Sequence, residues 1–188
     1  MPPRSLLIVL AVLSALVAQG ATASGVALAP ATVTAEHARA PRPTNLSRSR
    51  DLWATINVCD TRAHANMIGI RGSMPGLGNR RSRLSMRIRV QYKAKSDGRW
   101  HGAGRLADSG WKAIGSTIRQ VIESGRDFRF TPPSDGGSHL LRGSVSFRWK
   151  RGGRIVARQH RFTRSGHKTT AGADPAGDSA GRCEITAP

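Results

Sequence analysis

Residues 84–92 read Leu-Ser-Met-Arg-Ile-Arg-Val-Gln-Tyr, and residues 141–149 read Leu-Arg-Gly-Ser-Val-Ser-Phe-Arg-Trp. In both stretches, apolar or small side chains alternate strictly with polar ones. Successive side chains point to opposite faces of a β-strand, so a period of two predicts a half-buried strand and argues against a helix. We therefore expect two strong strands, each with an apolar face in the core and an arginine-bearing face toward solvent.

Shorter candidate strands lie on both sides of these two stretches. In residues 53–59 the alternation predicts Ala54, Ile56 and Val58 on one face and Thr55, Asn57 and Cys59 on the other. Further candidates are 67–74, 99–101, 111–114, 127–130, 155–162 and a last short strand around Cys183 and Ile185. Gly, Pro, Asn and Asp separate them, and Gly152-Gly153 marks a hairpin turn. Seven or eight short strands with such turn signals predict an all-β fold, an antiparallel β-sandwich.

One window, residues 116–124, carries a helical signal. Ile118, Val121 and Ile122 have the i, i+3, i+4 spacing of a helix face, over barely two turns. The window is compatible with one short helix, with an irregular crossover or with another strand, and the sequence leaves all three open.

The chain begins with the pattern of a secretory signal peptide, residues 1–23. Arg4 supplies a positive charge, residues 6–17 are apolar, and Ala21-Thr22-Ala23 forms a cleavage site before Ser24. The apolar run is shorter than the about 20 residues that cross a bilayer, so we expect cleavage and secretion rather than a membrane span. Residues 24–50 are rich in Ala, Thr, Pro and Arg and are expected to be a disordered linker, which leaves 51–188 as a single domain.

The sequence contains two cysteines, Cys59 and Cys183. In an oxidising compartment, an even pair of cysteines usually forms a bridge. We predict a disulfide between the first strand and the last. The alternative is two buried free thiols.

The hairpin of residues 141–162 resembles the terminal hairpin of immunoglobulin-like and fibronectin-III-like sandwiches. More narrowly, the signal peptide, the opening strand from Trp53 to Cys59 and the late Cys183 resemble secreted, uncharacterised β-sandwich proteins of high-GC actinobacteria. This resemblance covers about residues 53–185 and implies an immunoglobulin-like sandwich, but a sandwich fold does not specify an activity. The tyrosine corner of antibody domains is missing, since Tyr92 is the sole tyrosine.

The sequence motifs argue against an enzyme. Residues 177–181 match the G-x-S-x-G pattern of a hydrolase nucleophile, but no histidine follows Ser179, as that catalytic order requires. The 6 histidines show no metal-ligand spacing, and Asp174 and Asp178 alone are too few oxygen ligands for Ca²⁺. We expect no enzyme activity, no cofactor and no metal site.

Basic residues dominate the charge of the chain. Lys and Arg number 30 against 11 Asp and Glu, which gives a formal net charge of +19. Six candidates for binding a polyanion lie on the predicted outward faces of the two strong strands: Arg87, Arg89, Lys93, Arg142, Arg148 and Lys150. Like charges opposite one another destabilise a sheet, so an anionic partner would relieve that cost. The alternative is the arginine bias of a GC-rich genome, which produces a charged surface without a ligand.

Two functional hypotheses follow. The first is a secreted, non-enzymatic β-sandwich that binds an anionic cell-envelope polymer, or another polyanion, through arginines. The second is a passive structural or protein–protein interaction domain of the envelope, with another secreted protein as its partner. Export and the aromatic content of only 5% argue against an intracellular nucleic-acid role.

Overall fold

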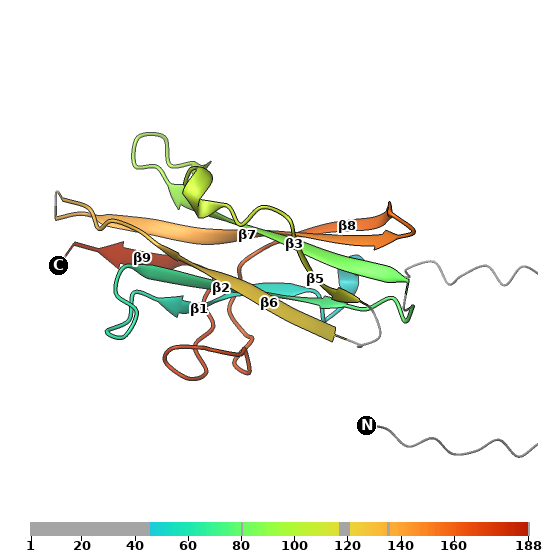
Figure 1. Ribbon diagram of the computed structural model, residues 1–188. Helices are drawn as coiled ribbons and strands as arrows, with labels where there is room; N and C mark the ends of the chain where they lie inside the picture. Colours follow the sequence, from blue (N-terminus) through green and yellow to red (C-terminus); the bar gives the residue numbers. More distant parts are fainter. Residues whose placement is uncertain (1–45, 80, 117–120, 135, 188) are drawn as a thin grey trace, which may run out of the picture. The chain divides into compact units, whose positions relative to one another are not determined.

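The computed structural model describes residues 46–79, 81–116, 121–134 and 136–187 (Figure 1). The expected signal peptide, residues 1–23, and residues 24–45 of the expected linker lie outside the described residues. Leu46 is buried against the core and begins a short 3-10 turn, η1 (Leu46–Arg48). The packed domain therefore includes residues 46–50, which the sequence assigns to the linker.

The described residues form nine strands, one more than the upper expectation. They are β1 (Trp53–Cys59), β2 (Met67–Pro75), β3 (Ser82–Lys93), β4 (Trp100–Gly102), β5 (Lys112–Ser116), β6 (Val121–Arg129), β7 (Ser138–Arg151), β8 (Arg154–Phe162) and β9 (Cys183–Thr186). A second 3-10 turn, η2 (Arg105–Ala107), precedes β5. All the strand pairs in this part of the chain are antiparallel, as predicted.

The strands form the two sheets of a β-sandwich. One sheet has the order β1–β2–β6, and the six-stranded sheet has β3 and β7 at its centre. The short strands β4 and β5 share the outer edge of β3, while β8 and β9 share the outer edge of β7. Figure 1 shows the layer of β3, β7 and β8 above the layer of β1, β2 and β6.

The core between the sheets contains the apolar faces that the alternation predicts. Fully buried side chains from β3 and β7 include Leu84, Met86, Ile88, Val90, Leu141, Val145, Phe147 and Trp149. The Trp149 indole N–H donates to the carbonyl of Pro75 at 2.8 Å, so its polar atom is satisfied inside the core. Tyr92, predicted on the same face, is 39% exposed because it ends the apolar row and contacts His101 instead.

The alternation predicted for β1 is wrong at its end. The register shifts between Ile56 and Val58, which marks a β-bulge. A bulge adds one residue and reverses the side-chain alternation beyond it. Cys59 therefore lies opposite Ile68 and packs against the core, and Val58 lies opposite Gly69.

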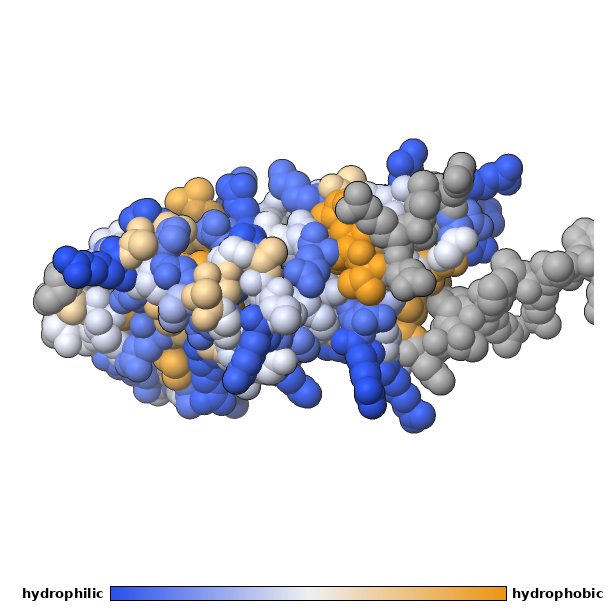
Figure 2. Space-filling view, turned by 90° about the horizontal axis from the view of Figure 1, so that it is seen from below, coloured by the Kyte–Doolittle hydropathy of each residue, from blue (hydrophilic) through white to orange (hydrophobic). Residues whose placement is uncertain are grey.

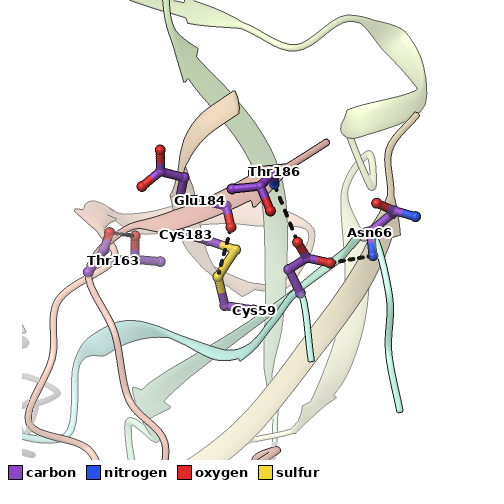
Figure 3. The surroundings of a disulfide bond; sticks show 8 residues. Cys59, Asn66, Thr163, Cys183, Glu184 and Thr186 are labelled. Atoms are coloured by element: carbon purple, nitrogen blue, oxygen red, sulfur yellow. Dashed lines mark hydrogen bonds between the residues drawn. A yellow bond between two sulfur atoms is a disulfide. The ribbon is translucent and has the colours of Figure 1, made fainter. Parts of the chain in front are cut away.

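The bulge brings Cys59 to β9, and the predicted disulfide to Cys183 is confirmed (Figure 3). The two Cα atoms are 5.4 Å apart, within the normal range for a bridge. Beside it, the Asp60 carboxylate accepts hydrogen bonds from the backbone N–H groups of Asn66, at 2.7 Å, and Thr186, at 3.4 Å. The first and last strands are thus joined by a covalent bond and by a shared carboxylate.

The helical signal of residues 116–124 is not realised in the described part of that window. Ser116 ends β5, and residues 121–124 begin β6, where Glu123 pairs with Ser73 of β2. Residues 117–120 lie outside the described residues. Two turns are too short to form a stable helix, whereas pairing with β2 satisfies the backbone of this segment.

Residues 163–182 connect β8 to β9 and run along the edge of β1. Backbone N–H groups of Arg164 and Asp174 donate to Ala54 and Asn57 at 2.9 and 2.8 Å. The Asn57 side chain, fully buried, donates to the carbonyls of Ala171 and Gly172 at 3.2 and 2.7 Å. This crossing segment, seen below β1 in Figure 1, therefore takes the place of a neighbouring strand.

Thr163 fills the gap between β8 and β9 along the edge of β7. Its hydroxyl accepts a hydrogen bond from the Gly143 N–H at 3.0 Å and donates one to the Gly181 carbonyl at 2.7 Å. A Cβ at Gly143 would lie 2.5 Å from the Thr163 methyl carbon and 3.0 Å from Ile70 Cδ1. Glycine at this position is thus required by the close approach of Thr163.

Removal of the disulfide by Cys59→Ala with Cys183→Ala is expected to lower the free energy of unfolding by about 2–5 kcal/mol. The physical reason is the greater freedom of the unfolded chain once the link across 124 residues is lost. Urea denaturation of the oxidised protein and the double variant measures the difference. Thiol titration of the unreduced, denatured protein provides the control, and two free thiols per chain would contradict the bridge.

Gly143→Ala is expected to destabilise the protein by about 1–3 kcal/mol, because the added methyl group overpacks the site of Thr163 and Ile70. Gly102→Ala is the matched control, since a Cβ there meets nothing within 4 Å and the backbone is not in the left-handed region. Thermal unfolding of both variants makes the comparison. Equal effects of the two substitutions would refute the tight contact at Gly143.

Candidate polyanion-binding surface

The pairing of β3 with β7 puts most of the predicted basic residues on one face of the six-stranded sheet. Directly opposed pairs on this outer face are Arg87–Ser146, Arg89–Ser144, Gln91–Arg142 and Ser85–Arg148. Arginine thus stands opposite a short or neutral side chain in all four. Between β3 and β7, the expectation of like charges directly opposite one another is met only at the end of the ladder, where Arg83 pairs with Lys150. Between β7 and β8, Arg148 lies opposite Arg158 and Arg151 lies opposite Arg154. The central arginines form a staggered pattern that limits their mutual repulsion.

Arg142 of this face is held by two aromatic rings and an amide. Its guanidinium lies over the Phe162 ring at 3.9 Å and over the Trp100 ring at 4.3 Å, measured to the ring centroids. Its Nε donates to the Gln91 side chain at 2.9 Å. Burial, and then the nearby charge of Arg182, lower the pKa of Arg142 from its usual value. The rings and the amide orient this guanidinium without neutralising it.

Arg148 has a similar setting at the other end of the sheet. Its guanidinium lies 3.6 Å from the centroid of Trp111, which is 37% exposed. The Nε atom is buried and has no hydrogen-bond partner. Beside it, a shallow depression of about 500 Å³ is lined by Trp111, Arg158 and His160, among others. Arg158, the cation that lines this depression, lies directly opposite Arg148 of β7.

Arg87 differs from the other candidates because a carboxylate neutralises it. Its Nε donates to both oxygens of Asp108, at 2.9 and 3.1 Å, and an Nη group also binds Asp108. The hydrogen bonds from Arg87 hold the pKa of Asp108 below its usual value, and the Gly110 N–H adds to this. Arg89, two residues along β3, is exposed and is not part of an ion pair in the described residues.

Lys93 and Lys150 lie at the ends of the two long strands rather than in the centre of the face. Lys93 is exposed and borders a depression together with Lys95 and Glu184, so an acidic group is close. Lys150 is half-buried beside Arg83. The structure therefore places Arg89, Arg142 and Arg148 along one face of the paired strands, with the two lysines at the strand ends.

The sequence-based prediction did not include several residues of this surface. Trp100, Trp111 and Phe162 supply the rings, and Arg158 and Arg182 add charge. His160 joins them, with its ring edge against Phe162 at 4.6 Å. Burial, followed by Arg89, Arg161 and Arg142, lowers the pKa of His160, so this side chain is neutral at pH 7. The alternation of β8 places Arg158, His160 and Phe162 on one face and is the signal that predicts their grouping.

The serine of the G-x-S-x-G match, Ser179, hydrogen-bonds within the fold. Ser179 Oγ accepts a hydrogen bond from the His167 N–H at 2.8 Å and lies 2.8 Å from the hydroxyl of Thr55. These contacts fix the crossing segment to β1. Asp174, considered above as an oxygen ligand for Ca²⁺, instead hydrogen-bonds to Thr61 and to the His64 ring, and these two bonds lower its pKa.

Comparisons with known proteins add no family. No protein-family model matches the chain, and no curated protein matches its sequence. Among the described residues, no helix is long and apolar enough to cross a bilayer, and no three His, Cys, Asp or Glu side chains group as a metal site. The functional interpretation therefore depends on the surface itself.

The Arg87–Asp108 pair predicts a pH dependence of stability. A lowered pKa in the folded state means that Asp108 contributes stability above its unfolded pKa of about 3.9 and that this contribution is lost as the pH falls through the folded pKa. Asp108→Asn should cost about 1 kcal/mol at pH 7, because water still reaches the pair, and less below pH 3. Urea unfolding at the two pH values checks this.

The exposed Asp51 provides the matched control, and Asp51→Asn should change stability little at either pH. Some pH dependence must remain in Asp108→Asn, since the pKa values of Asp97 and Asp174 are also lowered. A loss for Asp108→Asn that is the same at pH 7 and pH 3 would contradict an ionic role for this carboxylate.

Proposed function

We propose that the protein is a secreted, non-enzymatic binder of an anionic cell-envelope polymer or a similar polyanion. The outer face of the six-stranded sheet is the binding surface in this proposal. Its principal support is that the guanidinium groups of Arg142 and Arg148 are held on aromatic rings instead of on carboxylates. Such cations are oriented in advance and keep their charge for a ligand.

The charge balance of the surface supports the same proposal. Asp108 neutralises Arg87, but Arg89, Arg142 and Arg148 have no carboxylate among the described ion pairs. A polyanion that binds them releases its condensed counterions, which gives affinity without a deep pocket. The rings of Trp100 and Trp111 offer apolar surface to the sugar or backbone units of such a polymer.

Export is part of this proposal. The disulfide between Cys59 and Cys183 is compatible with an oxidising compartment, where such bridges persist. Together with the expected signal peptide of residues 1–23, it supports a function outside the cytoplasm. Anionic polymers of the envelope are then the polyanions that the protein meets at high concentration.

One observation favours the second hypothesis, a passive interaction domain. In the described residues, β8 pairs only with β7, so its other edge has free backbone groups. Exposed edges of this kind bind partner strands through main-chain hydrogen bonds. Such binding depends weakly on salt, whereas binding of a polyanion by arginines weakens steeply as salt rises.

Arg89→Glu is expected to lower affinity for heparin and for poly(glycerol phosphate) about tenfold at low salt, because it replaces an attraction by a repulsion in the centre of the surface. The slope of log K against log salt should fall by about one. Fluorescence anisotropy with labelled polymers measures both quantities, with neutral dextran as the uncharged reference.

Arg62→Glu is the matched control, since Arg62 is exposed in the loop between β1 and β2. This substitution changes the net charge by the same amount as Arg89→Glu. It should reduce affinity much less than Arg89→Glu. Equal losses in the two variants would mean that net charge, and not this surface, governs binding. Affinity that does not change with salt would refute the polyanion proposal and favour the interaction domain.

A further inference from the structure

A second cationic region lies where the start of β1 meets the end of β8. It is a solvent-open cavity of about 330 Å³. Its lining includes Arg50, Trp53, Arg161, Phe162, Arg164 and His167. The three arginines come from the segment before β1, from β8 and from the crossing segment, so the fold rather than a local sequence run brings them together.

The charge of this cavity is unbalanced. Its lining contains three arginines and no carboxylate. Arg50, Arg161 and Arg164 take part in none of the ion pairs among the described residues. Glu123 opposes the lowering of the His167 pKa. Asp51 lies in the chain between the lining residues Arg50 and Leu52 but does not itself line the cavity. Three cations that share one hollow repel one another, so an anion bound there would gain their combined attraction.

The guanidinium group of Arg161 is held in a fixed orientation by backbone carbonyls. Its two Nη groups donate to the backbone carbonyls of His160, at 2.8 Å, and Ser47. Carbonyl oxygens fix a guanidinium in place without cancelling its charge. Burial, and then the charge of Arg164, lower the pKa of Arg161, which is the expected result when cations are crowded without a counterion.

The lining of the cavity also contains a pair of stacked rings. The rings of Trp53 and His167 stack with centroids 4.3 Å apart and planes 13° from parallel. The backbone N–H of His167 donates to Ser179 Oγ, which in turn contacts the hydroxyl of Thr55 in β1. Burial lowers the pKa of His167 against the opposing effect of Glu123, so the imidazole is neutral at pH 7. A neutral ring N–H can donate to an oxyanion, and a bound anion would favour protonation of this ring.

We propose that this cavity is a binding site for a single phosphate-class oxyanion, namely a phosphate or sulfate group carried by a small molecule or by a chain end. Guanidinium groups bind such tetrahedral anions through paired hydrogen bonds. The volume exceeds that of the bare anion and falls in the range of small-molecule sites, so the remainder of the ligand lies along Trp53. This site is separate from the polymer-binding surface proposed above, although Phe162 borders both.

Inorganic phosphate is the probe that tests the proposal. The full mature chain, oxidised, is titrated with phosphate and with sulfate at constant ionic strength, and the ring proton signals of His167 and the indole N–H of Trp53 are followed by NMR. We expect saturable shifts with a millimolar Kd and an upward shift of the His167 titration. Chloride at the same ionic strength should not reproduce them, and shifts that chloride reproduces equally would overturn the site.

Variants locate the binding. Arg164→Gln and Arg50→Gln remove exposed charges and should each raise the Kd for phosphate at least fivefold. Arg154→Gln, an exposed position at the far end of β8, is the matched control and should leave the Kd unchanged. Unchanged phosphate affinity in both Arg164→Gln and Arg50→Gln would refute the proposal even if the protein binds heparin.

The two proposals fail separately. Arg89→Glu should impair heparin binding and leave phosphate binding intact, whereas Arg164→Gln should impair phosphate binding and retain most heparin binding. Loss of phosphate binding in Arg89→Glu equal to that in Arg164→Gln would show that small anions bind the sheet face rather than the cavity.

Discussion

The pairing of β3 with β7 is the constraint on which the remaining structure depends. Its register runs without interruption from Ser82–Arg151 to Tyr92–Leu141. Because side chains alternate with a period of two, a slip of β3 by one residue would turn Arg83, Arg87 and Arg89 into the core and Leu84 and Ile88 out of it. Burial of each large apolar side chain stabilises the native register by about 1.5–3 kcal/mol. The outward direction of the arginines is therefore a consequence of the core.

The edges of the central pair turn this charged face into a surface with defined geometry. Trp100 of β4 lies opposite Lys93 at the end of β3, and Trp111 immediately precedes β5, whose Lys112 lies opposite Met86. Phe162 comes from the end of β8. Each aromatic ring lies beside a cation that β7 supplies, Arg142 or Arg148. Long arginine side chains lose much conformational freedom when they are ordered, and contact with a ring offsets this cost. Aromatic residues of the edge segments thus orient the arginine side chains of the long strand β7.

The sequence predicts the features that local alternation and turn chemistry control. The two strong strands and the Gly152-Gly153 turn belong to this class and are confirmed. The bridge from Cys59 to Cys183 is confirmed as well, but its prediction rests on the even pair of cysteines and the expected compartment. The bulge after Ile56 and the strand at 121–124 could not be predicted, because both depend on pairing with β2. The rings around Arg142 and the lining of the cavity at Arg161 come from segments that are far apart in the chain. The alternation within one strand does not predict which distant segments will be in contact.

The arrangement of the arginines bears on whether composition alone accounts for them. A mutational bias toward arginine explains their number, and the staggering against Ser144, Ser146 and Gln91 explains how the sheet tolerates them. Neither explains why Arg142 and Arg161 are oriented by rings and carbonyls while the chain places so few carboxylates beside them. An ordered cation without a counterion retains the cost of partial burial, as the lowered pKa values of both groups indicate. In the proposed function, a bound anion offsets that cost, and this property would distinguish a binding surface from a merely basic one.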